Sequence, residues 1–261
     1  MKNLPKTLFF DFDGTLVDPT THVIPESALK AINQVIENGY RVAIASGRNY
    51  PLIKITGVLE MAPWAGLILN NGQIIMDEKH TELKHSFIEA KAIRQIIKTA
   101  RSLGSNLFFS CPDGDFMDRE ADDLMRRAHA FFDEPIPEIG IYTHQRVDKI
   151  LVYHPKGFDY SIYQAIEGVD VFPSVSTYAD IATQGVSKAA SIETFCDLMG
   201  IEHDYAAFGD SLNDYDMIQH ARIGVAMGNG EQALKDIADV IAPDVHDDGI
   251  AKVLKQLGYI Y

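Results

Sequence analysis

The sequence predicts an α/β protein with a doubly wound, mostly parallel sheet, into which a second, α+β domain is inserted. Two observations support this prediction. In the first third of the 261 residues, short apolar runs alternate with helical patterns, and each apolar run ends in polar residues. Such alternation is typical of βα units in a parallel sheet. The rhythm stops near residue 77 and returns near residue 185, which indicates an insertion.

The first expected strand, residues 7–10, is an uncharged run of strand-forming residues that ends at Asp11. Runs of this kind are typical of strands buried on both faces of a sheet. Because side chains alternate along an extended chain, we expect Asp11 and Asp13 to point to the same side. Gly14 allows the sharp turn that follows.

Two carboxylates in one small space raise each other's pKa unless a cation or hydrogen-bond donors lie between them. Asp11 and Asp13 therefore call for a metal ion, a shared proton, or both. The alternatives are a calcium-binding loop and a solvated turn. A calcium loop of the EF-hand type would need a third oxygen ligand before its glycine and a late glutamate. A solvated turn seldom follows an apolar strand, and open α/β sheets bind ligands at the strand ends.

Two further units of the same kind follow. A helical pattern begins at Pro25 and stops at Gly39, and a second helix begins at Pro51. We expect strands at residues 40–45 and 67–69. The polar residues that follow these strands are Ser46, Gly47, Arg48, Asn70, Asn71 and Gly72. Three strands thus place polar groups at one edge of the predicted sheet.

The inserted domain is expected at residues 80–182, with the core formed by residues 1–79 and 183–261. A polar link begins near residue 77, and the segment after it mixes helical and strand patterns without the parallel rhythm. The expected helices are residues 90–103, 120–132 and 160–166, and the expected strands are residues 106–110, 147–153 and 169–181.

The parallel rhythm returns at Gly185, where Ser187 is a plausible cap for a helix that ends at Gly200. Lys188 lies in the first turn of this helix, where the helix dipole disfavours a cation. The lysine is therefore either solvated or faces an anion. The next strand, residues 205–208, precedes Asp210, Asn213 and Asp214. Further strands are expected at residues 223–227 and 240–242, and further helices at residues 231–237 and 250–257.

Composition limits the class of partner. A net charge of -14 argues against binding to nucleic acids or anionic membranes, which requires clustered Lys and Arg. Cys111 and Cys196 lie far apart and lack metal-ligand spacing, so we expect reduced thiols and a cytoplasmic location. The apolar run near the N-terminus is cut by Asp11, and no later run approaches membrane-spanning length.

Four motifs of the chain resemble, in order and approximate separation, those of haloacid dehalogenase-like phosphatases. They are Asp11-Phe12-Asp13-Gly14-Thr15, Ser46-Gly47-Arg48, Gly185-Val186-Ser187-Lys188 and Gly209-Asp210-Ser211-Leu212-Asn213-Asp214. The insert resembles the type IIB cap of the Cof-type subfamily, whose members are mostly magnesium-dependent hydrolases of small phosphorylated metabolites. Ala189 departs from the family pattern, in which glycine often follows the lysine.

The resemblance implies a role for each motif. Asp11 would be the nucleophile that forms an aspartyl-phosphate, and Asp13 the general acid and then base. Mg²⁺ would be held by the side chains of Asp11 and Asp210 and by the backbone carbonyl of Asp13. Asp214 would bind the ion through water or support the site. Ser46 and Lys188 would hold the phosphoryl oxygens. The remaining residues expected to bind or orient the phosphate are Thr15, Gly47, Arg48, Asn71 and Asn213.

The expected partner is a small phosphorylated metabolite, selected by an insert that closes over the strand ends. Two other activities remain open. A phosphoryl-accepting regulatory protein also places acids and a lysine at strand ends, but it needs no second aspartate to activate water. A phosphomutase of the same superfamily would use the same site, and only the product distinguishes it. A non-catalytic binding protein fits less well because all four motifs are intact.

Overall fold

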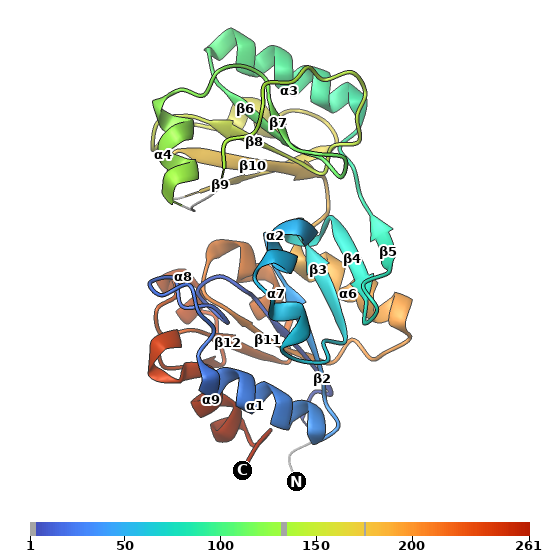
Figure 1. Ribbon diagram of the computed structural model, residues 1–261, viewed down its shortest axis with the longest axis vertical. Coiled ribbons are helices and arrows are strands. Elements are labelled where there is room, and N and C mark those ends of the chain that lie inside the picture. Colours follow the sequence, from blue (N-terminus) through green and yellow to red (C-terminus); the bar gives the residue numbers. More distant parts are fainter. Residues whose placement is uncertain (1–3, 132–134, 175) are drawn as a thin grey trace. The chain divides into compact units, whose positions relative to one another are not determined.

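The computed structural model describes residues 4–131, 135–174 and 176–261. The chain forms two compact units (Figure 1). The first, here called the core unit, runs up to His85 and resumes at Ser187; the second, here called the inserted unit, is Ser86–Val186. None of the described helices combines the length and the apolar character that crossing a membrane requires.

The core unit is built on an eight-stranded sheet of order β13-β12-β11-β1-β2-β3-β4-β5. Its central strand β1 (Thr7–Phe10) pairs in parallel with β2 (Arg41–Ala45) and β11 (Tyr205–Gly209). All neighbouring pairs from β13 to β3 are parallel, whereas the pairs β3–β4 and β4–β5 are antiparallel, so that β4 runs against the other strands. The other strands are β3 (Gly66–Leu69), β4 (Ile74–Asp77), β5 (Glu82–His85), β12 (Ile223–Ala226) and β13 (Val240–Ile241).

Helices cover both faces of this sheet, as the alternation of β1 side chains requires. Phe10 packs with α1 (Glu26–Glu37) and α9 (Gly249–Leu257) on one face. Phe9 packs with α6 (Lys188–Met199) and α7 (Tyr215–His220) on the other. Each fully buried Phe contributes about 1.5–3 kcal/mol through apolar burial, which fixes β1 at the centre. The predicted doubly wound fold is confirmed.

The remaining short elements of the core unit lie in its connections. α2 (Tyr50–Ile55) begins after Asn49, whose side chain accepts a hydrogen bond from the backbone N–H of Leu52. α8 (Gln232–Lys235) follows β12. The 3₁₀ turns are Val58–Glu60, Asn70–Gly72, Leu212–Asp214 and Val245–Asp247.

The inserted unit is an antiparallel sheet of order β7-β6-β8-β10-β9 with helices on both faces. Its strands are β6 (Leu107–Ser110), β7 (Phe116–Met117), β8 (Lys149–Tyr153), β9 (Val169–Pro173) and β10 (Tyr178–Thr183). α3 (Ala90–Leu103) and α5 (Ser161–Gln164) pack on one face, and α4 (Asp123–Phe131) packs on the other. The α+β character expected for the insert is thus present.

Several local expectations differ from the structure, and three of the differences are instructive. The polar link expected from residue 77 contains β5, an edge strand with alternating exposure, so the core unit extends to His85. The charged, outward side chains of β5 discourage pairing with the edge of another sheet, and they also made the segment look like a polar link. The single strand expected at 169–181 is the hairpin of β9 and β10. The helix expected from residue 120 begins at Asp123, and residue 132 lies outside the described residues.

Candidate active site

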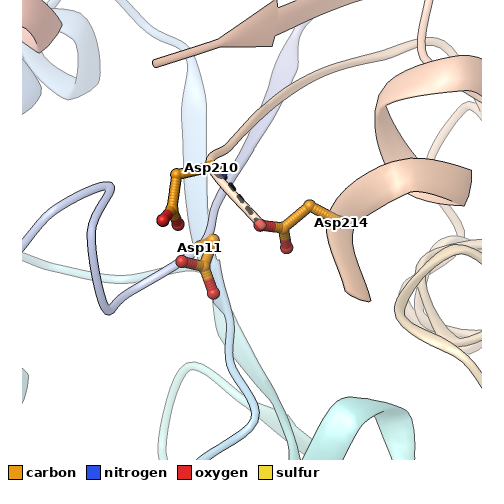
Figure 2. Close-up of side chains that lie close together, drawn as sticks. All are labelled: Asp11, Asp210 and Asp214. Carbon is orange, nitrogen blue, oxygen red and sulfur yellow. Dashed lines mark hydrogen bonds between the residues drawn. The ribbon is translucent and has the colours of Figure 1, made fainter. Parts of the chain in front are cut away.

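The carboxyl ends of β1 and β11 bring three aspartates together (Figure 2). Asp11 follows β1, and Asp210 and Asp214 belong to the loop and 3₁₀ turn after β11. Each of the three offers one carboxylate oxygen, and these oxygens lie within 4.8 Å of one another. Asp11 and Asp214 are buried. The parallel pairing of β1 with β11 therefore creates an acidic cluster in which Asp11 is joined by Asp210 and Asp214, and not by Asp13 as its position two residues after Asp11 had led us to expect.

The three carboxylates of the cluster repel one another even though Lys188 lies beside them. Burial and the neighbouring charges of Asp214 and Asp210 raise the pKa of Asp11 well above its ordinary value, against the attraction of Lys188. Burial and the charge of Asp214 raise the pKa of Asp210 to about 7, against the same lysine. A divalent cation between the carboxylates would remove this penalty and keep them ionised.

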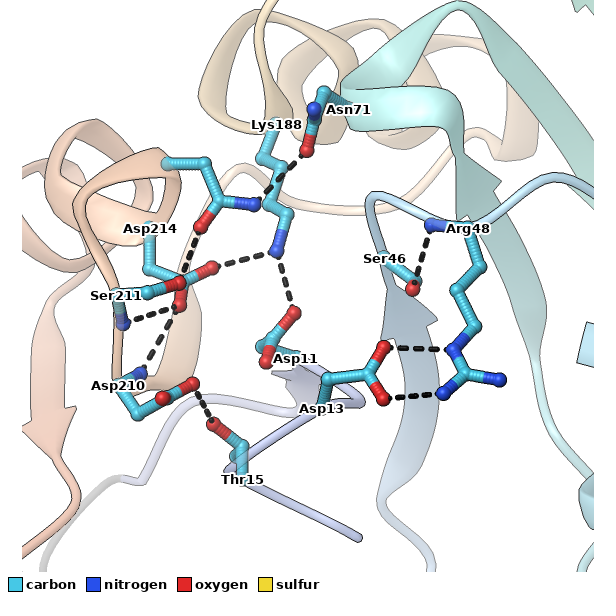
Figure 3. A network of polar contacts seen from close by, with 11 residues as sticks. Asp11, Asp13, Thr15, Ser46, Arg48, Asn71, Lys188, Asp210, Ser211 and Asp214 are labelled. Atoms are coloured by element: carbon cyan, nitrogen blue, oxygen red, sulfur yellow. Dashed lines mark hydrogen bonds and ion pairs between the residues drawn. The ribbon is translucent and has the colours of Figure 1, made fainter. Parts of the chain in front are cut away.

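Lys188 is the buried cation of the site (Figure 3). It is the first residue of α6, which Ser187 caps by accepting a hydrogen bond from the backbone N–H of Ala190. Its Nζ lies 2.5 Å from Asp11 Oδ1 and 2.6 Å from Asp214 Oδ1. Burial disfavours its charge, but the attraction of these two carboxylates raises the pKa of Lys188 above its ordinary value. The sequence left open whether Lys188 is solvated or faces an anion, and the structure shows that it faces two carboxylates.

Asp214 joins the lysine to the loop after β11. Its Oδ2 accepts hydrogen bonds from the backbone N–H groups of Asp210 and Ser211 at 3.0 and 3.1 Å, while Oδ1 binds Lys188. Gly209 allows this arrangement, since a Cβ there would lie 2.5 Å from the Asp214 Cβ. Asp214 therefore fixes the loop that presents Asp210.

Asp210 packs against the turn after β1. Gly14 has φ +81°, and a Cβ added to it would lie 2.3 Å from Asp210 Oδ2, so only glycine fits there. The hydroxyl of Thr15 donates to Asp210 Oδ1 at 3.3 Å. Thr15, predicted to orient the site, is thus placed to orient Asp210.

Asp13 lies outside the cluster of three carboxylates and is bound by Arg48. The guanidinium donates from Nε to Asp13 Oδ2 at 2.7 Å and from Nη2 to Oδ1 at 2.6 Å (Figure 3). The Asp13 side chain is 51% exposed. Arg48, expected to contact phosphate, is therefore engaged with the residue expected to serve as acid and base.

The remaining predicted residues connect the ends of β2, β3 and β11. Ser46 is buried, and its Oγ accepts a hydrogen bond from the backbone N–H of Arg48 at 3.0 Å. Asn213 donates to Asn71 Oδ1 at 2.9 Å, and a Cβ on Gly47 would lie 3.1 Å from the same oxygen. Asn71 adopts φ 55°, a conformation that asparagine tolerates, and its N–H bonds to the Ser46 carbonyl. These residues form one polar rim.

Asn229 is a site-supporting residue that the sequence analysis missed. Its Nδ2 donates to the carbonyl of Gly14 at 2.7 Å, and its Oδ1 accepts from the backbone N–H of Val245 at 2.9 Å. It lies in the loop after β12, where Gly228 and Gly230 look like ordinary turn residues. The available signal was its place after a fifth parallel strand, β12.

Comparisons with known proteins identify the family. The family model for haloacid dehalogenase-like hydrolases matches residues 8–254. YkrA of Bacillus subtilis (strain 168), a putative phosphatase, is 31% identical over 268 residues, which cover 98% of each chain.

Two solved structures share the fold of the chain. BT1666 from Bacteroides thetaiotaomicron, a phosphatase of the haloalkanoate (HAD) enzyme superfamily, is 25% identical with a TM-score of 0.91, covering 99% of this chain and 97% of that one. The HAD subclass IIB sugar phosphatase BT4131 is 25% identical with a TM-score of 0.85, covering 98% and 100%. The chain therefore belongs to the haloacid dehalogenase-like hydrolases, in the group that contains the phosphatases.

Proposed function

We propose that the protein is a magnesium-dependent phosphatase that hydrolyses small phosphate monoesters through an aspartyl-phosphate on Asp11. The observation that most supports this function is the buried Asp11 carboxylate, held by Lys188 beside two further aspartates. A nucleophilic carboxylate must stay ionised in a nearly dry site, and a fixed ammonium group stabilises that form. Family membership supports the same reaction class.

The residues of the cluster fit Mg²⁺. Asp11, Asp210 and Asp214 offer only oxygen donors, which Mg²⁺ prefers, and burial makes their mutual repulsion costly until a metal cation joins Lys188 in offsetting it. We assign Asp11 and Asp210 as ligands, together with the backbone carbonyl of Asp13. Both oxygens of Asp214 already accept hydrogen bonds from the chain, which favours a supporting role. When bound, the ion would neutralise phosphoryl charge.

In the first step, a carboxylate oxygen of Asp11 attacks phosphorus as the bond to the leaving oxygen breaks. Lys188 binds Asp11 Oδ1 and would also face the phosphoryl oxygens, as would the hydroxyl of Ser46. Asp13 would give its proton to the leaving alkoxide. In the second step, Asp13 would take a proton from water as the water attacks the aspartyl-phosphate, which releases inorganic phosphate and restores Asp11.

Arg48 gives Asp13 a defined position before substrate binds. Because both Asp13 oxygens accept hydrogen bonds from the guanidinium, one of these contacts must open and the released oxygen must take up a proton from solvent before Asp13 can protonate a leaving group. The freed N–H of Arg48 would then be available to a substrate phosphate, as expected from the motif. We propose that the Arg48–Asp13 pair exchanges partners in this way during turnover.

The proposed substrate is a small phosphorylated metabolite, such as a sugar phosphate. The relative BT4131 is a sugar phosphatase, and a net charge of -14 disfavours nucleic acids. We propose that the inserted unit selects the substrate, because the chain re-enters the core unit at Ser187, one residue before Lys188. The buried, unpaired thiols of Cys111 and Cys196 support a cytoplasmic location.

The decisive experiment is a screen of phosphorylated metabolites for phosphate release, with Mg²⁺ and with excess chelator. We expect release from sugar phosphates only when Mg²⁺ is present, and inhibition by Ca²⁺, which accepts more ligands in looser geometry. Full activity in chelator would contradict the role of the metal. An isomerised sugar phosphate without free phosphate would instead identify a phosphomutase.

A further inference from the structure

The inserted unit contains a cleft that the proposed reaction does not use. The cleft has a volume of about 500 Å³, within the range of small-molecule sites. It lies between α3 and the segment that follows Gly140, so every described residue that lines it belongs to the inserted unit. The lining residues are Arg94, Ile97, Lys98, Arg101, Phe109, Asp118, Gly140, Ile141, Tyr142 and His144.

One side of the cleft is cationic. Arg94, Lys98 and Arg101 are spaced by four and three residues, so they lie on one face of α3. All three are exposed, and among the described residues no carboxylate lies within ion-pair distance of any of them. Asp118 also lines the cleft, but its carboxylate is bound to Arg119 and to the backbone N–H of Leu107. In a chain of net charge -14, three unpaired cations in one cleft favour an anionic ligand.

The other side of the cleft is aromatic and apolar. The ring of Tyr142 lies nearly parallel to that of Phe109, at an interplanar angle of 10° and a centroid distance of 6.4 Å. Ile141 is 75% exposed, and His144 lies 5.7 Å from Tyr142, centroid to centroid. Burial raises the pKa of Tyr142, while the charge of Arg94 lowers it, which indicates that the guanidinium lies near this phenol. The cleft thus presents a ring surface beside its cations.

We propose that this cleft binds a small anion that carries a flat aromatic ring, with a nucleoside monophosphate as the best-fitting class. The phosphate would bind Arg94, Lys98 and Arg101, and the base would pack against Tyr142 and Ile141. Arginine suits this task because its planar group donates two hydrogen bonds to one phosphate. The proposal is independent of the reaction at Asp11.

Calorimetric titration of the full chain with adenosine monophosphate tests the proposal, with chelator present to prevent turnover. Ribose 5-phosphate tests the anion alone, and adenosine tests the ring alone. Because a sugar phosphate can also bind at the candidate active site, the comparison is made for the part of the binding that is lost when the cleft cations are removed. In that part, we expect each of these to bind at least about tenfold more weakly than adenosine monophosphate, since each lacks half of the recognised chemistry. Cleft binding of adenosine monophosphate that is no tighter than that of ribose 5-phosphate would overturn the proposal.

Two double variants locate the site. Arg94→Gln with Arg101→Gln removes two cleft charges, whereas Lys91→Gln with Arg127→Gln removes two charges of the same unit that do not line the cleft. We expect the first to weaken binding by about tenfold or more and the second by less than about twofold. Because neither changes the core unit, binding at the candidate active site contributes equally to both. Equal losses in the two variants would refute a defined site.

A third variant separates the ring contact from general charge. Tyr142→Leu should weaken binding of adenosine monophosphate and of adenosine, while binding of ribose 5-phosphate stays unchanged. A change of equal size for all three ligands would mean that the aromatic side plays no specific part, and would overturn the assignment. Circular dichroism confirms that each variant retains its helices.

Discussion

Arg48 contacts both carboxylate oxygens of Asp13, at 2.6 and 2.7 Å, through parallel N–H donors. Arg48→Gln removes this contact and one expected phosphate ligand. If Arg48 exchanges one of its contacts with Asp13 for a contact with the substrate phosphate during turnover, the KM of this variant should be about tenfold higher than that of the wild type, with a smaller fall in kcat. Steady-state kinetics measure the two effects separately. A fall in kcat alone would mean that Arg48 acts only on Asp13.

Asp11→Asn should abolish phosphatase activity while the protein remains folded. An amide cannot form the acyl phosphate, and removal of one buried charge relieves repulsion within the cluster. Phosphate release and thermal unfolding measure the two effects. Asp216→Asn, an exposed change on α7, is the matched control and should retain near wild-type turnover. Activity of the Asp11 variant within about tenfold of wild type would rule out the nucleophile assignment.

Lys188→Met should destabilise the core unit as well as inactivate the enzyme. Removal of one partner leaves Asp11 and Asp214 buried without their cation, and such a break in a buried pair typically costs about 3–5 kcal/mol. Urea unfolding in chelator measures the loss. Lys30→Met, an exposed change on α1, serves as the control and should cost less than about 1 kcal/mol. A Lys188 variant as stable as wild type would contradict this account.

Asn229→Ala should weaken Mg²⁺ binding and lower kcat without changing the substrate preference. The side chain fixes the Gly14 carbonyl relative to Val245, and the Gly14 turn packs directly against Asp210. We expect a loss of about tenfold to a hundredfold in metal affinity, typical of residues that orient ligands. Titration of activity with Mg²⁺ measures this, and restoration of kcat at saturating Mg²⁺ would identify positioning as the cause. Unchanged Mg²⁺ affinity would exclude this role.

His154 should make the stability of the inserted unit depend on pH. Burial lowers the pKa of His154 below its ordinary value of 6.5, and the ring contacts Ser105 and Tyr163 and stacks on Phe158. The unfolded chain therefore binds more protons below about pH 6.5, and stability falls as the pH drops through this range. Urea unfolding at about pH 5 and about pH 7 measures the difference. His154→Gln should reduce it, and an unchanged difference would contradict the prediction.

The site was predictable where it depends on sheet geometry. Asp11, Ser46 and Asp210 each follow an apolar run, and the three runs form neighbouring parallel strands. Because the carboxyl ends of parallel strands lie at the same edge of the sheet, the three residues come together there. The bond between Arg48 and Asp13 was not predictable, because it depends on side-chain conformations. Asn229 escaped notice because its function lies in one contact with a distant backbone carbonyl.

The same distinction holds for the fold. The helix expected at residues 90–103 matches α3, since its apolar face and Gly104 define it locally. Strand β5 was missed because it lies at the edge of the sheet, where alternate side chains are charged and exposed, so its residues look like a polar link. The cleft beside α3 was not predicted, because it arises from the packing of that helix against residues 140–144.

The insertion also lengthens the interval between the synthesis of Asp11 and that of Lys188, two residues of the candidate active site. Lys188 follows Asp11 by 177 residues, which at a translation rate of roughly 5–20 residues per second corresponds to roughly 10 to 35 seconds. During that interval β1 lacks β11, its partner on one side, and exposes an uncharged apolar edge. A nascent chain arrested within the insert would therefore present a surface prone to aggregation, and the ribosome-bound protein acquires its buried lysine only after the inserted unit has been synthesised.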